Sequence, residues 1–211
     1  MNSGSTFFLA LAAVMAVVDW VAVAWDDKRL EYVSKPAATA LLLGVAATID
    51  VPHSAPWAWL IAALVFCLLG DVFLMLPRDA FIPGLASFAV AQVMFSISFV
   101  TQGIEVARLL GGLVVAVVAA TMLGHRFVGA LRRQGSRELV VPVVAYLIVI
   151  SAMAVTAVGG GSVVAILGAA FFLVSDSLIA ESRFVKSRRW HSVGIMVTYH
   201  VALAGLVLGL L

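Results

Sequence analysis

The sequence predicts an all-α, polytopic membrane helix bundle with eight transmembrane helices, and three observations lead to this fold class. Hydrophobic residues make up 64% of the 211 residues and charged residues only 11%. The mean hydropathy of +1.14 is far above that of a water-soluble domain of this length. Apolar runs long enough to cross a hydrocarbon core of ~30 Å recur eight times along the chain.

Short polar segments separate the eight expected spans. The spans are placed near residues 6–24, 36–50, 57–76, 81–100, 108–123, 139–158, 162–181 and 190–211. We do not expect the first to be a cleavable signal, because no Lys or Arg precedes Lys28 and a signal peptide needs a basic start. Pro36 opens the second span and Pro142 lies early in the sixth.

The basic residues predict an orientation. Twelve of the 13 Lys and Arg lie in the odd-numbered loops, which leaves only Arg108 on the other side. The positive-inside rule then makes the odd loops cytoplasmic and both termini external, and we expect the membrane to be a bacterial inner (plasma) membrane. All five tryptophans fall near span ends, where indole prefers the interface. Because the basic residues belong to these loops, no nucleic-acid partner is predicted despite a pI of about 9.0.

Two aspartates lie in apolar segments of similar sequence. Residues 66–74 and 171–179 align without a gap, and each has an aspartate, Asp71 or Asp176, after one small residue. A charge near the bilayer centre costs ~2.5 to 3.5 kcal/mol or more, so an intramembrane aspartate indicates function. A structural ion pair with Lys35 or a loop arginine is the other interpretation.

The spacing of these features suggests an internal repeat within one membrane domain, residues 1–211. The two aspartates are 105 residues apart, and Pro36 and Pro142 are 106 apart. We therefore predict two parallel four-helix halves, about 1–105 and 106–211, with each third helix contributing to a shared site. A similarity this short also arises by chance, so both duplication and chance similarity stay open as explanations.

Other polar residues inside the spans are candidates for the same pocket, which we expect to open in the cytoplasmic leaflet. The candidate substrate-binding residues are Lys35, Gln92, Tyr146, Ser175, Tyr199, His200 and Asp19. Three of them also have structural interpretations: a snorkelling lysine for Lys35, an aspartate facing the headgroups for Asp19, and a helix-contact histidine for His200. Since no HExxH or CxxC motif is present, we predict no metal and no cofactor, although a metal site assembled across helices stays open.

A set of ordered motifs extends from about residue 30 to the end: Lys35-Pro36, Gly70-Asp71, Leu74-Met75, Phe81, Gly84-Leu85, Ser87-Phe88, Pro142, Tyr146, Gly168-Ala169, Ser175-Asp176 and Phe184. In their order and spacing they resemble the YhhN-like lysoplasmalogenase family. The resemblance implies an eight-span hydrolase that cleaves the vinyl ether bond of lysoplasmalogens to a fatty aldehyde and a glycerophospho-base. It also implies that Asp71 and Asp176 are the acidic site residues and Lys35 the basic one. Two residues depart from the pattern, because Gln92 stands where a histidine is expected and Leu203 where a glutamine often follows.

Vinyl ether hydrolysis needs a proton delivered to the alkene carbon and water to capture the resulting oxocarbenium ion. One protonated carboxyl and one ionised carboxylate suit these steps, as in glycoside cleavage, so Asp71 and Asp176 are the predicted catalytic pair with their roles unassigned. Lys35 is expected to hold the phosphate of a lysophospholipid substrate taken from the membrane lipid. The alternative function is a proton-coupled small-molecule or lipid transporter, because carriers are also built from halves with one carboxylate each. The sequence leaves the oligomeric state open.

Overall fold

The computed structural model describes residues 2–49 and 54–210, and this part of the chain is helical, with no strand. A short 3-10 turn at Arg137–Leu139 precedes the sixth of eight α-helices. The helices are α1 (Ser3–Ala24), α2 (Lys28–Thr48), α3 (Ala55–Met75), α4 (Phe81–Gln102), α5 (Val106–Gln134), α6 (Val140–Gly160), α7 (Val163–Phe184) and α8 (Arg189–Leu208).

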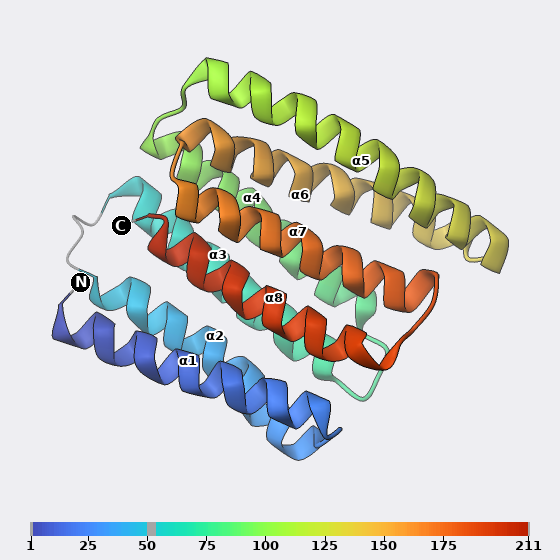
Figure 1. The fold of residues 1–211 in the computed structure, drawn as a ribbon, viewed down its shortest axis with the longest axis horizontal. Coiled ribbons are helices and arrows are strands. Elements are labelled where there is room, and N and C mark those ends of the chain that lie inside the picture. The colour runs from blue at the N-terminus through green and yellow to red at the C-terminus, as the bar shows by residue number, and fades with distance from the viewer. Residues whose placement is uncertain (1, 50–53, 211) are drawn as a thin grey trace.

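The helices run side by side along the long axis of the molecule (Figure 1). Consecutive helices pair as hairpins, α1 with α2, α3 with α4, α5 with α6 and α7 with α8, while α4 packs on α6 and α2 packs on α3 and α8. In Figure 1, α1 and α2 form one edge, α5 forms the other, and both termini lie at the same end. The aspartate-bearing helices α3 and α7 therefore lie in the interior of the bundle rather than at its edges.

Seven of the described helices are long and apolar enough to cross a membrane, and the chain is an integral membrane protein. The exception is α2, where a span near 36–50 was predicted. The structure extends this helix back to Lys28, because the Asp27 side chain caps it by accepting hydrogen bonds from two backbone N–H groups of its first turn. The added turns carry the charged residues Lys28, Arg29, Glu31 and Lys35, so one end of α2 is polar.

The fifth helix is longer than the predicted span 108–123. It continues to Gln134 and ends at Gly135, which adopts the left-handed conformation (φ 81°) that glycine tolerates best. Arg132 and Arg133 occupy its last turn, where cations interact favourably with the helix dipole. Hydropathy alone did not predict this extension because the added turns combine basic residues with the buried apolar residues Phe127, Ala130 and Leu131.

Close packing between α3 and α4 depends on two glycines. A Cβ on Gly70 would lie 2.6 Å from the ring of Phe88, and a Cβ on Gly84 would lie 2.6 Å from Leu74. The absence of both side chains lets the two helices approach closely and brings Phe88 and Leu74 beside the aspartate-bearing end of α3. Phe88 continues into a cluster of edge-to-face rings with Phe172 and Tyr199.

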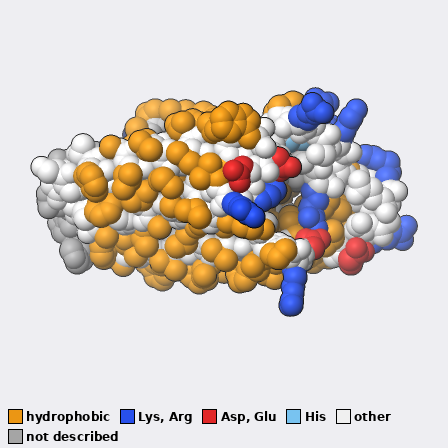
Figure 2. Space-filling view, turned by 90° about the horizontal axis from the view of Figure 1, so that it is seen from below, with side chains coloured by type: hydrophobic (Ala, Val, Ile, Leu, Met, Phe, Trp, Pro, Cys, Tyr) orange, Lys and Arg blue, Asp and Glu red, His pale blue; other side chains and the backbone are white. Residues whose placement is uncertain are grey.

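Charged side chains gather at one end of the molecule. Figure 2 shows Lys, Arg, Asp and Glu side chains at one end of this face, with a hollow among them, while hydrophobic side chains cover most of the rest. The loops at this end follow α1, α3, α5 and α7, which are the loops predicted to be rich in Lys and Arg. An apolar band bounded by a charged end is the surface expected of a membrane bundle.

Candidate active site

Asp71 is fully buried near the end of α3 and has its own set of partners. Its Oδ2 atom accepts hydrogen bonds from the Thr39 hydroxyl (2.7 Å) and the Tyr199 hydroxyl (2.9 Å). Its Oδ1 atom lies 3.5 Å from the Nζ atom of Lys35, whose side chain is 6% exposed. Lys35 and Thr39 are four residues apart on α2, so they share the helix face that contacts Asp71. This arrangement matches the ionised form of the carboxyl group, because a cation and two donors surround it.

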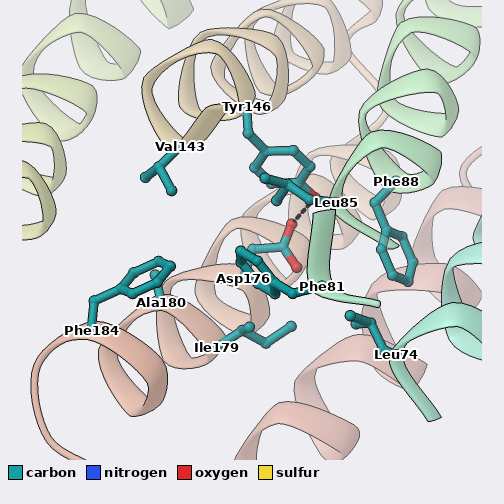
Figure 3. Close-up of a pocket in the computed structure, with 10 residues that line it drawn as sticks. All are labelled: Leu74, Phe81, Leu85, Phe88, Val143, Tyr146, Asp176, Ile179, Ala180 and Phe184. Atoms are coloured by element: carbon teal, nitrogen blue, oxygen red, sulfur yellow. Dashed lines mark hydrogen bonds between the residues drawn. The ribbon is translucent and has the colours of Figure 1, made fainter. Parts of the chain in front are cut away.

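Asp176, on α7, has a different environment. The Tyr146 hydroxyl on α6 donates a hydrogen bond to its Oδ2 atom. Among the described residues, no Lys or Arg forms an ion pair with Asp176. Figure 3 shows the second carboxyl oxygen turned away from Tyr146, toward Phe81, Ile179 and Leu74. One oxygen is thus fixed by a hydrogen bond, and the other faces apolar side chains.

Asp176 and Tyr146 supply the polar groups of a small, mostly apolar cavity, which we call the cavity (Figure 3). It is lined by Leu74, Phe81, Leu85, Phe88, Val143, Tyr146, Asp176, Ile179, Ala180 and Phe184. Its volume is about 50 Å³. Several of these residues, among them Leu74, Phe81 and Phe184, belong to the motifs quoted above for the family resemblance.

A larger polar space, which we call the vestibule, opens at the charged end. It has a volume of about 370 Å³. It is lined by Val23, Lys28, Glu31, Lys35, Leu74, Phe81, Ile179, Ser182, Arg183, Ser192, Ile195 and Met196. Three cationic side chains and one carboxylate face this space. Leu74, Phe81 and Ile179 line both the vestibule and the cavity, so they form the wall between the two.

The two aspartates do not meet in one chamber, as the sequence led us to expect. Asp176 lines the cavity. Asp71 pairs with Lys35, which lines the vestibule, but Asp71 itself lines neither the cavity nor the vestibule. No hydrogen bond joins the two carboxyl groups in the described part of the chain. Cys67, one turn before Asp71, is buried. The prediction failed because matching sequence contexts do not determine which way two side chains on different helices point.

Two other predicted residues form a second polar group near Lys35. The fully buried Asp19 accepts a hydrogen bond from the Ser34 hydroxyl (2.8 Å), so it does not face the headgroups. The Nδ1 atom of His200 accepts one from the indole N–H of Trp20 (3.0 Å). The Oδ2 atom of Asp19 and the Nε2 atom of His200 are buried without a hydrogen-bond partner among the described residues. Both side chains interact electrostatically with Lys35, which places them around the buried Lys35–Asp71 pair.

The structure also places the remaining candidates. Gln92 is fully buried beside the Tyr146 hydroxyl, and its amide has no hydrogen-bond partner within the described ranges. Ser175 is buried and donates its hydroxyl hydrogen bond to the carbonyl of Ile195, so it joins α7 to α8 rather than lining the cavity. Over residues 2–49 and 54–210, no group of three His, Cys, Asp or Glu is placed to hold a metal ion.

Several residues of the site were not predicted. Thr39 contacts Asp71, and its spacing of four residues from Lys35 is the signal that could have identified it. Glu31 and Arg183 line the vestibule, but in the sequence they look like ordinary loop-proximal charges. Only the convergence of residues from α2, α7 and α8 around the vestibule identifies them as part of a site.

Comparison with known proteins identifies a family and named relatives. The model of the YhhN family matches residues 30–210. Proteins named lysoplasmalogenase from Mycobacterium tuberculosis (strain CDC 1551 / Oshkosh) and Mycobacterium bovis are each 29% identical over 170 residues, which cover 79% of this chain and 65% of theirs. A mouse protein named lysoplasmalogenase TMEM86B is 33% identical over 155 residues, which cover 72% of this chain and 64% of that protein. The matched region thus spans just under two thirds of these relatives, and no solved structure matches.

Proposed function

The chain belongs to the YhhN family, and we propose on this premise that it is a lysoplasmalogenase-type membrane hydrolase. The proposed reaction cleaves the vinyl ether bond of lysoplasmenyl-ethanolamine or -choline to a fatty aldehyde and a glycerophospho-base. Relatives named lysoplasmalogenase support the reaction class. The observation that carries the proposal is a carboxyl group without a cation, Asp176, in an apolar cavity next to a cationic vestibule. A lysoplasmalogen has the matching shape, because its apolar chain and its phosphate flank the vinyl ether.

Asp176 is the proposed proton donor. A charge without a partner is costly in apolar surroundings, so this carboxyl group is best accommodated in its neutral form. The Tyr146 hydroxyl occupies one oxygen, which leaves the proton on the oxygen that faces the cavity. Transfer of that proton to the alkene carbon breaks the carbon–carbon π bond and forms an oxocarbenium ion. The resulting carboxylate then takes a proton from the attacking water, and the hemiacetal collapses to aldehyde and alcohol.

Asp71 has the complementary role in this proposal. Lys35, Thr39 and Tyr199 hold it ionised, and from its position outside the cavity its negative charge favours the developing positive charge at a distance rather than by contact with the substrate. Burial strengthens such an electrostatic effect because the local dielectric is low. The sequence left open which aspartate is the acid. In this proposal Asp176 is the acid and Asp71 is the ionised partner.

The membrane arrangement is also a proposal. We expect α2 to be the eighth span, with its apolar part after Pro36 in the hydrocarbon and its charged turns at the vestibule. The vestibule then opens to the cytoplasmic leaflet of a bacterial inner membrane, and both termini are external. The two halves remain a proposed repeat. When the halves are exchanged, the contact of α4 with α6 corresponds to that of α8 with α2, and α2 with α3 corresponds to α6 with α7, whereas α1 with α8 and α5 with α7 have no counterpart of comparable extent among the described helices.

The test is aldehyde release by the detergent-purified protein from lysoplasmenylethanolamine. Asp176→Asn and Asp71→Asn should each abolish turnover while the variants still elute as folded protein from a size-exclusion column. Full turnover by both variants ends the catalytic assignment. An inactive wild-type protein that instead moves protons or lipid across vesicles would favour the transporter alternative.

A further inference from the structure

The cavity is too small for a lipid chain. An apolar cavity of roughly 150 Å³ binds a molecule the size of benzene, whereas this cavity measures about 50 Å³. A long alkenyl chain that approaches from the vestibule therefore reaches Asp176 when the shared lining of Leu74, Phe81 and Ile179 moves aside. Phe81 has the largest of these side chains, so its displacement opens the most space.

Phe81 is held in place by Arg183. The guanidinium of Arg183 lies 4.1 Å from the centre of the Phe81 ring, a cation–π contact. The same guanidinium pairs with Asp79 at 2.6 Å, and the other carboxylate oxygen of Asp79 accepts a hydrogen bond from the backbone N–H of Phe81. The hydrogen bond that the Arg183 guanidinium donates to Asp79, together with its positive charge, holds the pKa of Asp79 below its usual range. Asp79, Arg183 and Phe81 thus form one connected unit at the rim of the vestibule.

Arg183 is also the vestibule cation best placed to exchange its partner. Lys35 pairs with the fully buried Asp71, and breaking a buried pair is strongly unfavourable. Lys28 pairs with Glu31 at 2.8 Å and with Asp26 at 3.6 Å, so it has two carboxylates. Arg183 has one, and the Asp79 side chain is 70% exposed, so the pair contributes little and is easily replaced.

We propose that Arg183 binds the substrate phosphate and that this exchange of Asp79 for phosphate releases Phe81 and opens the cavity. A planar guanidinium binds phosphate oxygens in a bidentate fashion, which makes the phosphodiester a stronger partner than one exposed carboxylate. Arg183 is therefore a specificity-determining residue that couples headgroup recognition to entry of the alkenyl chain. The inference rests on the proposed function for its substrate.

The experiment compares two vinyl ethers on the full chain in detergent: lysoplasmenylethanolamine and a 1-alkenylglycerol that lacks the phosphate. Arg183→Gln should raise KM for the phospholipid roughly 10-fold to 100-fold, the effect of losing a charge-assisted contact. KM for the alkenylglycerol should stay unchanged or fall, because Phe81 is no longer held. Asp79→Asn should lower KM for the phospholipid, because phosphate no longer competes with a carboxylate for Arg183.

Arg126→Gln is the matched control. Arg126 also forms an exposed ion pair at this end, with Glu181 at 2.6 Å, but it lines neither space. Its KM values should stay within about two-fold of the wild type for both substrates. An Arg183→Gln variant that loses both substrates equally, or that keeps its preference for the phospholipid, overturns the inference.

A binding measurement separates this inference from the proposed reaction. A saturated 1-alkyl lysophosphoethanolamine has the same headgroup and no cleavable vinyl ether. Its Kd, measured by calorimetry in detergent, should rise about 10-fold or more with Arg183→Gln and stay unchanged with Arg126→Gln. If the protein binds this lipid through Arg183 but does not cleave vinyl ethers, the proposed reaction is wrong and the role of Arg183 in binding stands. If the wild type and Arg183→Gln bind the lipid equally well, the proposed role of Arg183 is wrong.

Discussion

The carboxyl groups of Asp71 and Asp176 differ in what surrounds them, and this difference divides their proposed roles. Asp71 has a lysine and two hydroxyl donors, whereas the hydrogen-bond donor to Asp176 is the Tyr146 hydroxyl. The surroundings of Asp71 therefore suit a fixed negative charge, and those of Asp176 suit a proton donor. Lysozyme divides two carboxyl groups by environment in the same way.

The role of Tyr146 gives the first prediction. Tyr146→Phe removes the hydroxyl that fixes one oxygen of Asp176, so the acid loses its orientation without losing its proton. We expect kcat to fall about 10-fold to 100-fold with little change in KM, less than the loss in Asp176→Asn. The measurement is aldehyde release at saturating lysoplasmenylethanolamine. Tyr32→Phe is the control, because Tyr32 is 45% exposed, and it should keep wild-type kcat.

The ion pair of Lys35 with Asp71 gives the second prediction, on stability. Lys35→Met leaves a buried charge without its partner, which costs about 3 to 5 kcal/mol and lowers the apparent Tm in detergent. Adding Asp71→Asn removes that charge, so the double variant should regain part of the lost Tm while remaining inactive. If the Tm decreases of the two single variants simply add up in the double variant, Lys35 and Asp71 are not coupled.

At the scale of the elements, the position of the site depends on how closely α3 approaches α4. Gly70 lies directly before Asp71, and the ring of Phe88 occupies the space that a Cβ at Gly70 would need. Phe88 in turn lines the cavity of Asp176 and packs against Tyr199, the partner of Asp71. One close helix contact thus positions parts of both carboxylate environments.

The third prediction tests that contact with a pair of glycine substitutions. Gly70→Ala places a methyl group 2.6 Å from the Phe88 ring, so it should cost about 1 to 3 kcal/mol and reduce kcat. Gly111→Ala is the control, because a Cβ there has nothing within 4 Å. It should leave kcat unchanged and raise stability by up to about 1 kcal/mol, the difference in helix propensity. Equal effects of the two substitutions on the apparent Tm would show that the contact is not required.

The helices were largely predictable from the sequence because hydropathy identifies apolar runs without any tertiary information. Seven predicted spans correspond to helices apolar enough to cross a membrane, whereas α2 and the extended end of α5 combine apolar and charged turns, which hydropathy separates. Asp71, Asp176, Lys35 and Tyr146 were identified from their unusual positions in apolar segments. A polar pocket at this end was also predicted, but most of the residues that line the vestibule were not, since the loop-proximal ends of α2, α7 and α8 that supply them converge only in the fold.

At the scale of the whole molecule, the fold separates a charged end from an apolar body. The predicted repeat would give each half one aspartate, yet only Asp71 pairs with a lysine, so the halves differ chemically at equivalent positions. The vestibule opens at the charged end, and Asp176 lies deeper, beyond its wall. A lipid that enters with its headgroup at this end keeps its phosphate among cations and its chain among apolar side chains.

The fourth prediction concerns which side of the membrane this end faces. If the positive-inside rule holds, the loop after α7 is cytoplasmic and the end of α4 is external. Because Cys67 is buried and is the single cysteine, the wild-type protein should not react with a membrane-impermeant maleimide. In intact bacterial cells, Gln102→Cys should be labelled, whereas Ser187→Cys should be labelled only after the membrane is disrupted. Both positions are exposed, so a lack of labelling reports sidedness rather than burial. The opposite pattern would place the vestibule on the external face and require the substrate to arrive from that leaflet.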